Sequence, residues 1–181
     1  MKTVFYLALL GMAIITFSAQ AAVEPTWLFT VPKADSLKEG TYNIGFIYFD
    51  FGITDNLEIG IHGVKYSLGN LAFGLGLYPM GSPYLVFTPD TRSTSIHIGI
   101  KAAPYVFFGG LEAPVSDKAR FIVEINNGIS AGFRILPTRN WSLDLFLAFI
   151  SFEVYKYKYQ KFEVEEFHAI PAIQLAYSGR F

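Results

Sequence analysis

The last nine residues, Ile173–Phe181, read IQLAYSGRF and alternate between apolar side chains and small or polar ones. Because successive side chains of a β-strand point to opposite faces, this spacing predicts a strand with one apolar and one polar face. Most domains end in a few poorly ordered residues, whereas this chain ends on Phe181. We therefore expect the final strand to be built into the fold up to its last residue.

The same alternation recurs along the chain after Ala22, and helical spacing is nowhere sustained. Apolar residues follow this spacing at 57/59/61, 71/73/75/77, 96/98/100, 121/123/125 and 143/145/147. Turn-forming residues separate the runs, and Asn127-Gly128 is the sharpest hairpin signal among them. We expect about ten strands, with eight as the lower bound. Their expected ranges are 27–31, 36–50, 57–66, 71–78, 83–88, 94–102, 119–126, 129–136, 141–157 and 162–181.

The two faces of these strands predict a small closed barrel. Positions between the apolar residues are often Gly, Ala, Ser or an isolated charge, which suits a crowded lumen better than the charged outer face of a soluble sandwich. In a membrane, closure satisfies every backbone hydrogen-bonding group while the apolar face meets lipid. Aromatic residues near the expected strand ends fit an interfacial girdle: Tyr42, Tyr48, Tyr66, Tyr78, Trp141 and Tyr177. The sequence predicts an all-β, transmembrane, antiparallel up-and-down barrel of eight to ten strands, with a soluble lipocalin-like barrel as the alternative.

The start of the chain has the features of an export signal. Lys2 precedes a nearly unbroken apolar run, Val4–Phe17, and Ala19-Gln20-Ala21 matches a small-x-small cleavage site. The run of about 14 residues is shorter than a membrane-spanning helix requires. We expect a signal peptide over residues 1–21 and one barrel domain over residues 22–181.

Composition excludes several classes of protein. The 181 residues include no cysteine, which excludes a disulfide framework and a lipid-modified cysteine at the cleavage site. Without Lys2 the chain has 13 basic and 15 acidic side chains, so its formal charge is near −2. Nucleic-acid binding therefore has no electrostatic support.

The charged and polar residues on the inferred inner face form a candidate lumen network. Charges removed from water need partners, so we expect these groups to neutralise one another rather than to perform catalysis. The expected members are Glu58, His62, His97, Lys101, Arg120, Glu124, Arg134, Asp144, Gln174 and Arg180.

The chain end resembles the C-terminal signature of bacterial outer-membrane β-barrel proteins. The matching residues are Ile173, Leu175, Tyr177 and Phe181, whereas Gly179 departs from the apolar residue usual at its position. DFGITDNLEIGI, residues 50–61, is similar to a strand, periplasmic turn and strand of such barrels. The resemblance implies a location in the outer membrane, with membrane lipid and the barrel-assembly machinery as partners, and we expect a monomer. It implies nothing about a ligand or reaction.

No motif points to a cofactor, a metal or an enzyme. The three histidines lack metal-ligand spacing. His168, with Glu165, Glu166 and Ser151, could imitate the catalytic groups of lipid-modifying outer-membrane enzymes, but no Gly-x-Ser-x-Gly elbow is present. We expect a non-enzymatic barrel with a structural or surface-interaction role. A narrow pore or hydrophobic-ligand transporter is the alternative, and a lipid-modifying enzyme is a third possibility.

The hairpin within Glu153–Phe167 is expected to extend outside the cell and to carry a register offset. Folding it about Gln160-Lys161 sets Lys158 opposite Glu163, an odd–even pairing. The apolar residues of both flanking strands are odd-numbered, however, and should lie on the same face. The register must therefore shift by one residue between them. Pro171 favours a β-bulge around 169–171, and the apolar switch at 150–154 is the alternative.

Overall fold

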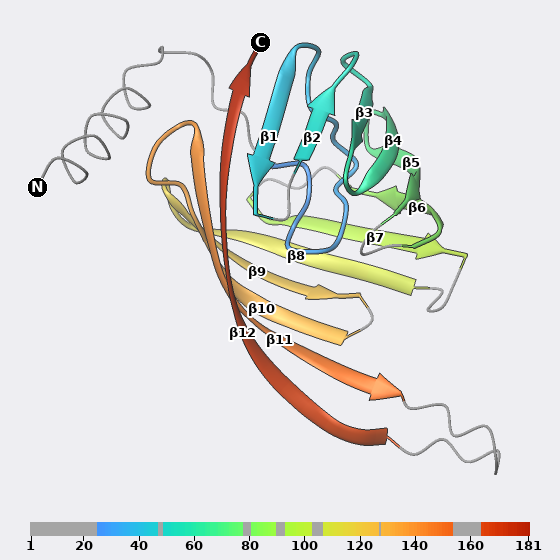
Figure 1. Cartoon of the computed structure of the whole chain (residues 1–181), viewed down its shortest axis with the longest axis vertical. Helices are drawn as coiled ribbons and strands as arrows, with labels where there is room; N and C mark the ends of the chain where they lie inside the picture. Colours follow the sequence, from blue (N-terminus) through green and yellow to red (C-terminus); the bar gives the residue numbers. More distant parts are fainter. Residues whose placement is uncertain are drawn as a thin grey trace, which may run out of the picture.

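The computed structural model describes residues 25–46, 49–77, 81–89, 93–102, 107–126, 128–153 and 164–181. Within these ranges the chain is all-β, and twelve strands form a closed barrel (Figure 1). The expected signal peptide, residues 1–21, lies outside the described residues. No helix in the described part of the chain is long and apolar enough to cross a membrane.

Every strand pairs antiparallel with the next one along the chain, and β12 pairs with β1 to close the barrel. The strands are β1 (Thr41–Gly45), β2 (Phe49–Gly52), β3 (Leu57–Gly60), β4 (Gly63–Leu68), β5 (Leu71–Gly76), β6 (Pro83–Phe87), β7 (Ser95–Lys101), β8 (Phe107–Ser116), β9 (Ala119–Ile125), β10 (Gly128–Ile135), β11 (Trp141–Glu153) and β12 (Val164–Arg180). The predicted antiparallel up-and-down barrel is confirmed.

The predicted number of strands is too low, because two predicted strands are hairpins. Range 36–50 spans β1 and the start of β2, and range 57–66 spans β3 and most of β4. Gly63, at φ 116, permits the tight turn between β3 and β4. Residues 108–117, which fall between the expected strands 94–102 and 119–126, belong mainly to β8, which is paired on both sides.

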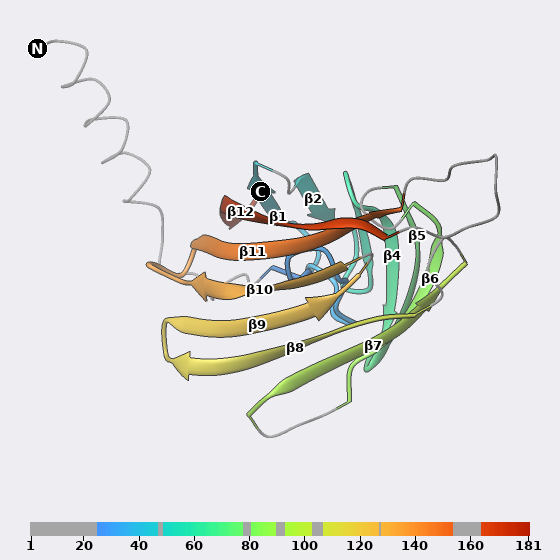
Figure 2. The ribbon, with the colours of Figure 1, turned by 90° about the horizontal axis from the view of Figure 1, so that it is seen from below.

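Residues 27–31 were predicted as a strand of the wall, and this prediction is wrong. Among the residues that the structure describes, their only bridge joins Trp27 to Pro32 within the same segment. Trp27, Leu28, Phe29 and Val31 are nonetheless almost completely buried. Figure 2 shows this blue part of the chain in the space that the strands enclose. The N-terminal segment thus fills the barrel instead of extending its sheet.

The wall has an apolar outer face and a polar inner face. On β4, Val64 and Leu68 are 41% and 54% exposed, whereas Lys65 between them is 2% exposed. The same alternation holds on β7, where Ile96, Ile98 and Ile100 are exposed and His97 and Lys101 are buried. The wall therefore reverses the usual distribution of side chains, with apolar residues outside and polar residues inside.

One end of the barrel carries an aromatic cluster on its wall. The Tyr177 ring centroid lies 5.1 Å from that of Trp141 and 6.2 Å from that of Tyr42. Tyr66 packs against Phe73 at 5.5 Å on another part of the wall. Two further residues of the expected girdle, at positions 48 and 78, lie outside the described residues.

The expected register offset is present, but not at Pro171. From Trp141 to Ser151, odd residues of β11 lie opposite odd residues of β12, whereas Glu153 lies opposite Val164. The shift therefore falls in the alternative region, 150–154, and the bulge expected at 169–171 is wrong. Pro171 lies opposite Leu147 in this regular ladder, and among the described residues β1 pairs with β12 only at positions 176–180, so no described ladder needs a donor at the proline on its other side. The hairpin tip, residues 154–163, lies outside the described residues.

Candidate functional site

The candidate site is the lumen, which is occupied by residues 25–37, here called the luminal segment. The segment folds on itself: the Leu28 N–H donates to the Val31 carbonyl at 2.8 Å, and the Lys33 N–H donates to the Thr26 carbonyl at 3.0 Å. A tight turn at 28–31 leaves further backbone groups without partners in the segment. Since such groups are costly when buried, the wall must supply their partners.

Glu124 on β9 binds the N–H groups of this turn. Its carboxylate accepts hydrogen bonds from the backbone N–H groups of Phe29, Thr30 and Val31 at 2.9–3.1 Å and from Thr30 Oγ1 at 2.7 Å. Successive N–H groups that converge in this way form an anion-binding concavity. One buried carboxylate therefore satisfies three backbone donors and fixes the depth of the turn in the lumen.

Arg134 on β10 binds the carbonyl groups of the same turn. Its guanidinium donates to the carbonyl oxygens of Trp27 and Leu28 at 2.9 and 2.8 Å. The same group holds Asp144, its cross-strand neighbour on β11, through two hydrogen bonds of 2.8 Å. This bidentate geometry is the one that arginine forms best with a carboxylate. Both charges are neutralised while two carbonyls of the segment gain donors.

A second ion pair holds the two ends of the luminal segment. Glu58 on β3 accepts hydrogen bonds from Thr26 Oγ1 at 2.7 Å, from the Trp27 indole at 3.2 Å and from the Leu37 N–H at 2.8 Å. Lys65, opposite Glu58 on β4, lies 3.3 Å from its carboxylate and donates to the Thr26 carbonyl at 3.2 Å. The pair is buried together with the segment.

Further polar contacts come from the remaining wall. Lys33 forms a 2.8 Å ion pair with Glu112 on β8, which lies 3.6 Å from Arg120. Asn126 donates to Thr30 at 3.2 Å and accepts from Lys101 at 2.7 Å. Asp50 and His62 form another luminal pair at 3.1 Å. Wall and segment thus share a single polar network.

Apolar packing completes the fit. The Phe29 ring stacks on Phe146 with centroids 4.2 Å apart, and the Trp27 ring stacks on His62 at 4.3 Å. A Cβ atom at Gly110 would lie 2.2 Å from Leu28 Cδ1, so the wall is without a side chain where Leu28 approaches it. The shape of the wall therefore complements the side chains of the luminal segment.

The structure places most residues of the expected lumen network inside the barrel. Buried members are Glu58, His62, His97, Lys101, Glu124, Arg134, Asp144 and Gln174. Arg120 is partly exposed near one end. The placement of Arg180 in the lumen is corrected: it is exposed, because it is the last residue of β12 and lies at the rim.

Sequence reasoning missed the partners of this network. Lys33, Asp50, Lys65 and Glu112 are buried with it. The alternation in β4 and β8 could have placed Lys65 and Glu112 on the inner face, but nothing in the sequence signals that Lys33 approaches the wall from within. The network surrounds an internal segment rather than filling the lumen by itself.

The residues of the expected assembly signal lie at the barrel seam. Ile173 and Leu175 are exposed on the outer face, and Tyr177 packs against Trp141. Phe181 is 79% exposed, and its N–H donates to the Gly40 carbonyl at 2.9 Å. The C-terminus is thereby joined to the residue that precedes β1.

The described residues give no metal centre, since no group of three or more His, Asp or Glu among them could hold a metal ion. Residues 151 and 165–168, which carry the hypothetical enzyme group, lie in β11 and β12, but their side chains are outside the described part of the structure. Comparison with protein-family models, with curated proteins and with solved structures finds no match for this chain.

Proposed function

We propose that the mature chain is a monomeric, non-enzymatic β-barrel of a bacterial outer membrane with a structural role, closed by its own N-terminal segment. The observation that carries this proposal is the combination of an apolar outer face with a filled lumen. Aliphatic and aromatic side chains cover the outer face of the wall, where contact with water is unfavourable and contact with lipid is favourable. The signal-like N-terminus and the C-terminal resemblance support the same location.

The luminal segment favours a structural role over transport. Its turn lies between Glu124 and Arg134, and its ends are held by Glu58. A transported solute would have to displace these contacts and leave buried charges without partners. The narrow pore remains the second candidate, because a barrel of twelve strands without its filling would enclose more space than the eight to ten strands expected from the sequence.

The location is tested by expressing the full chain in a bacterium with an outer membrane and fractionating the cells. We expect the protein in the outer membrane, released only by detergent, with a mobility in electrophoresis that changes on heating. Release as a soluble protein would overturn the membrane assignment.

The structural role is tested by reconstituting the same protein into planar lipid bilayers. We expect no conductance from barrels whose mobility shows that they are folded. Regular single-channel steps would overturn the closed barrel and establish the pore instead.

A further inference from the structure

The strands differ in length around the barrel, so the wall is not equally high on all sides. β1 to β6 have four to six residues each, whereas β8 to β12 have 7 to 17 residues each. Figure 1 shows this difference between the cyan and green strands and the yellow to red strands. We call β1 to β6 the short wall and β8 to β12 the long wall.

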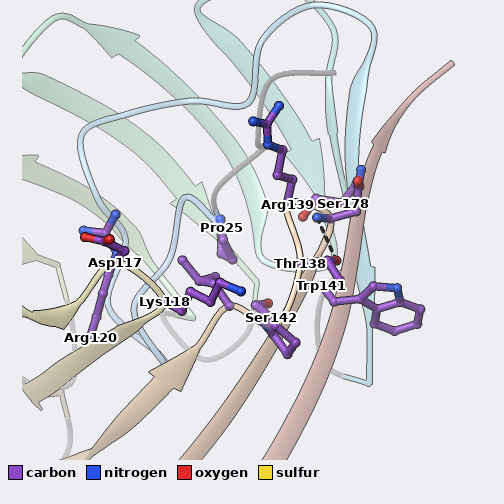
Figure 3. Close-up of a pocket in the computed structure, with 12 residues that line it drawn as sticks. Pro25, Asp117, Lys118, Arg120, Thr138, Arg139, Trp141, Ser142 and Ser178 are labelled. Carbon is purple, nitrogen blue, oxygen red and sulfur yellow. Dashed lines mark hydrogen bonds between the residues drawn. The ribbon is translucent and has the colours of Figure 1, made fainter. Parts of the chain in front are cut away.

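The end of the barrel that carries the C-terminus, here called the base, has exposed charged residues in its turns. Glu39 and Asp55 lie below the short wall, and Asp117, Lys118 and Arg139 lie below the long wall. Figure 3 shows the last three around a pocket of about 550 Å³ that opens at the base. Because this polar border is present below both walls, their difference in height falls at the opposite end, here called the top.

The height of each wall follows from the length of its strands. A strand rises about 3.4 Å per residue, and strands of membrane barrels tilt by about 45°. The four residues of β3 therefore cover about 10 Å along the barrel axis, and the ten residues of β8 cover about 24 Å. The apolar band of such barrels is about 25 Å tall. The long wall matches this height, whereas the short wall reaches less than half of it.

The outer face of the short wall is apolar up to its top. The hairpin of β3 and β4 turns at residues 61–62. Ile59 and Ile61 are 41% and 49% exposed, whereas the charged residues of these two strands, Glu58 and Lys65, are buried in the lumen. This face therefore suits contact with acyl chains rather than with water, although it is too low to match a bilayer of ordinary thickness.

Polar groups lie just inside the top of the short wall. Asp50, opposite Gly60 at the top of β3, pairs with the His62 ring at 3.1 Å. A bilayer of ordinary thickness would place acyl chains above this wall and next to polar groups of the lumen, which hydrocarbon does not solvate. A tilt of the whole barrel would move the apolar band of the short wall but would not widen it.

We propose that the lipid bilayer is thinned beside the short wall, so that lipid headgroups lie level with Ile61. A hydrophobic surface that is shorter than the bilayer is accommodated by local thinning at a modest cost per Å of mismatch. The partner of this surface is therefore a locally thin lipid bilayer. This inference rests on the proposed location in a bacterial outer membrane.

The depth of the top is tested with lysines in phosphatidylcholine vesicles, because the cost of a lysine on the lipid face depends on its depth. Ile61→Lys is compared with Ile61→Ala. Leu111 is 36% exposed in the middle of β8, and Leu111→Lys is compared with Leu111→Ala. Relative to alanine, lysine should lower the folding equilibrium constant by at least about thirtyfold at Leu111 and by less than about fivefold at Ile61.

The two positions separate failure of this inference from failure of the membrane location. A loss of about thirtyfold or more at both would overturn the thinning, since Ile61 would then lie in hydrocarbon or against a partner protein, and would leave the membrane location intact. A small loss at both would overturn the membrane location and the thinning together.

A direct measurement of depth covers the case in which a lysine variant does not fold. The chain contains no cysteine, so a fluorophore attached to Ile53→Cys, Ile61→Cys or Leu111→Cys reports on one position each. Ile53 is 47% exposed directly after β2, at the base. Lipids with a quencher near the headgroup should quench Ile53→Cys and Ile61→Cys most, and lipids with a quencher at the chain ends should quench Leu111→Cys most. Chain-end quenching of Ile61→Cys as strong as that of Leu111→Cys would overturn the proposal.

Discussion

The luminal segment and β12 are both rich in apolar residues, yet they are held in different ways. β12 has 17 residues and ladders of backbone pairs on both sides. The luminal segment has one isolated bridge and depends on side chains of the wall. Stability in the wall is therefore distributed over many equivalent contacts, whereas stability in the lumen is concentrated in a few buried charges.

The largest effect should come from Arg134→Ala, which leaves Asp144 buried without its partner and removes the donors to two carbonyls of the luminal segment. We expect the free energy of unfolding to fall by about 3–5 kcal/mol. Denaturant unfolding in detergent, followed by tryptophan fluorescence, measures the change. Arg139→Ala, at an exposed position, is the control and should stay within about 0.5 kcal/mol of the parent. Equal losses in the free energy of unfolding for the two variants would contradict the distinction between buried residues of the lumen and exposed residues of the rim.

A charge on the outer face of β12 should have the next largest effect. Ile173 is exposed on the wall, and Ile173→Lys should cost about 2–4 kcal/mol in a lipid bilayer if this face meets hydrocarbon. Unfolding in lipid vesicles measures the loss, with Ile173→Val as the neutral control. A lysine tolerated without loss would show that this face does not contact lipid.

Glu124→Gln should have a smaller effect on the lumen, because the amide retains one acceptor oxygen for the backbone N–H groups of Phe29, Thr30 and Val31. We expect a loss of about 1.5–3 kcal/mol, the range for hydrogen bonds to charged groups. The same unfolding assay applies, and Glu39→Gln at an exposed carboxylate is the control. If both variants unfold like the parent, Glu124 does not anchor the segment.

Deletion of Phe181 should have the smallest effect on stability. The ring centroid lies 6.4 Å from those of Tyr42 and Phe51, and such contacts contribute about 0.5–1.5 kcal/mol. If Phe181 is an assembly signal, the truncated chain should refold in detergent but reach the outer membrane in strongly reduced amounts. Unchanged amounts, measured by quantitative blotting of membrane fractions against a Phe181→Tyr control, would mean that the signature has been misinterpreted.

The sequence predicted the wall because the face of each strand residue depends only on local alternation. Lys65 and Val64 on β4 illustrate this, as one is buried in the lumen and the other is exposed. The hairpin between β3 and β4 was merged into one predicted strand because its turn carries no marked turn sequence, although the apolar positions change from odd (57, 59, 61) to even (64, 66, 68) across it. The odd and even positions of the apolar residues predicted that the register between β11 and β12 shifts by one residue. Pro171 suggested the wrong place for this shift.

The sequence did not predict the luminal segment, because its apolar residues fit a strand equally well. What decides between wall and lumen is the distant set of partners, Glu58, Glu124 and Arg134, which lie 21 to 107 positions away in the chain. The expected network was therefore mostly composed of residues that are buried in the lumen, and pairs such as Arg134 and Asp144 do neutralise each other. The sequence did not predict that these residues also hold a segment inside the barrel.

The most direct test of the closed barrel is the reactivity of a thiol placed in the luminal segment. The chain contains no cysteine, so Leu28→Cys provides a single label site at a position that is 0% exposed. In the folded protein, a water-soluble maleimide should leave Leu28→Cys unmodified while modifying the exposed control Lys38→Cys completely, and denaturant should make both react. Equal labelling of the two variants in the folded barrel would contradict a lumen closed by residues 25–37.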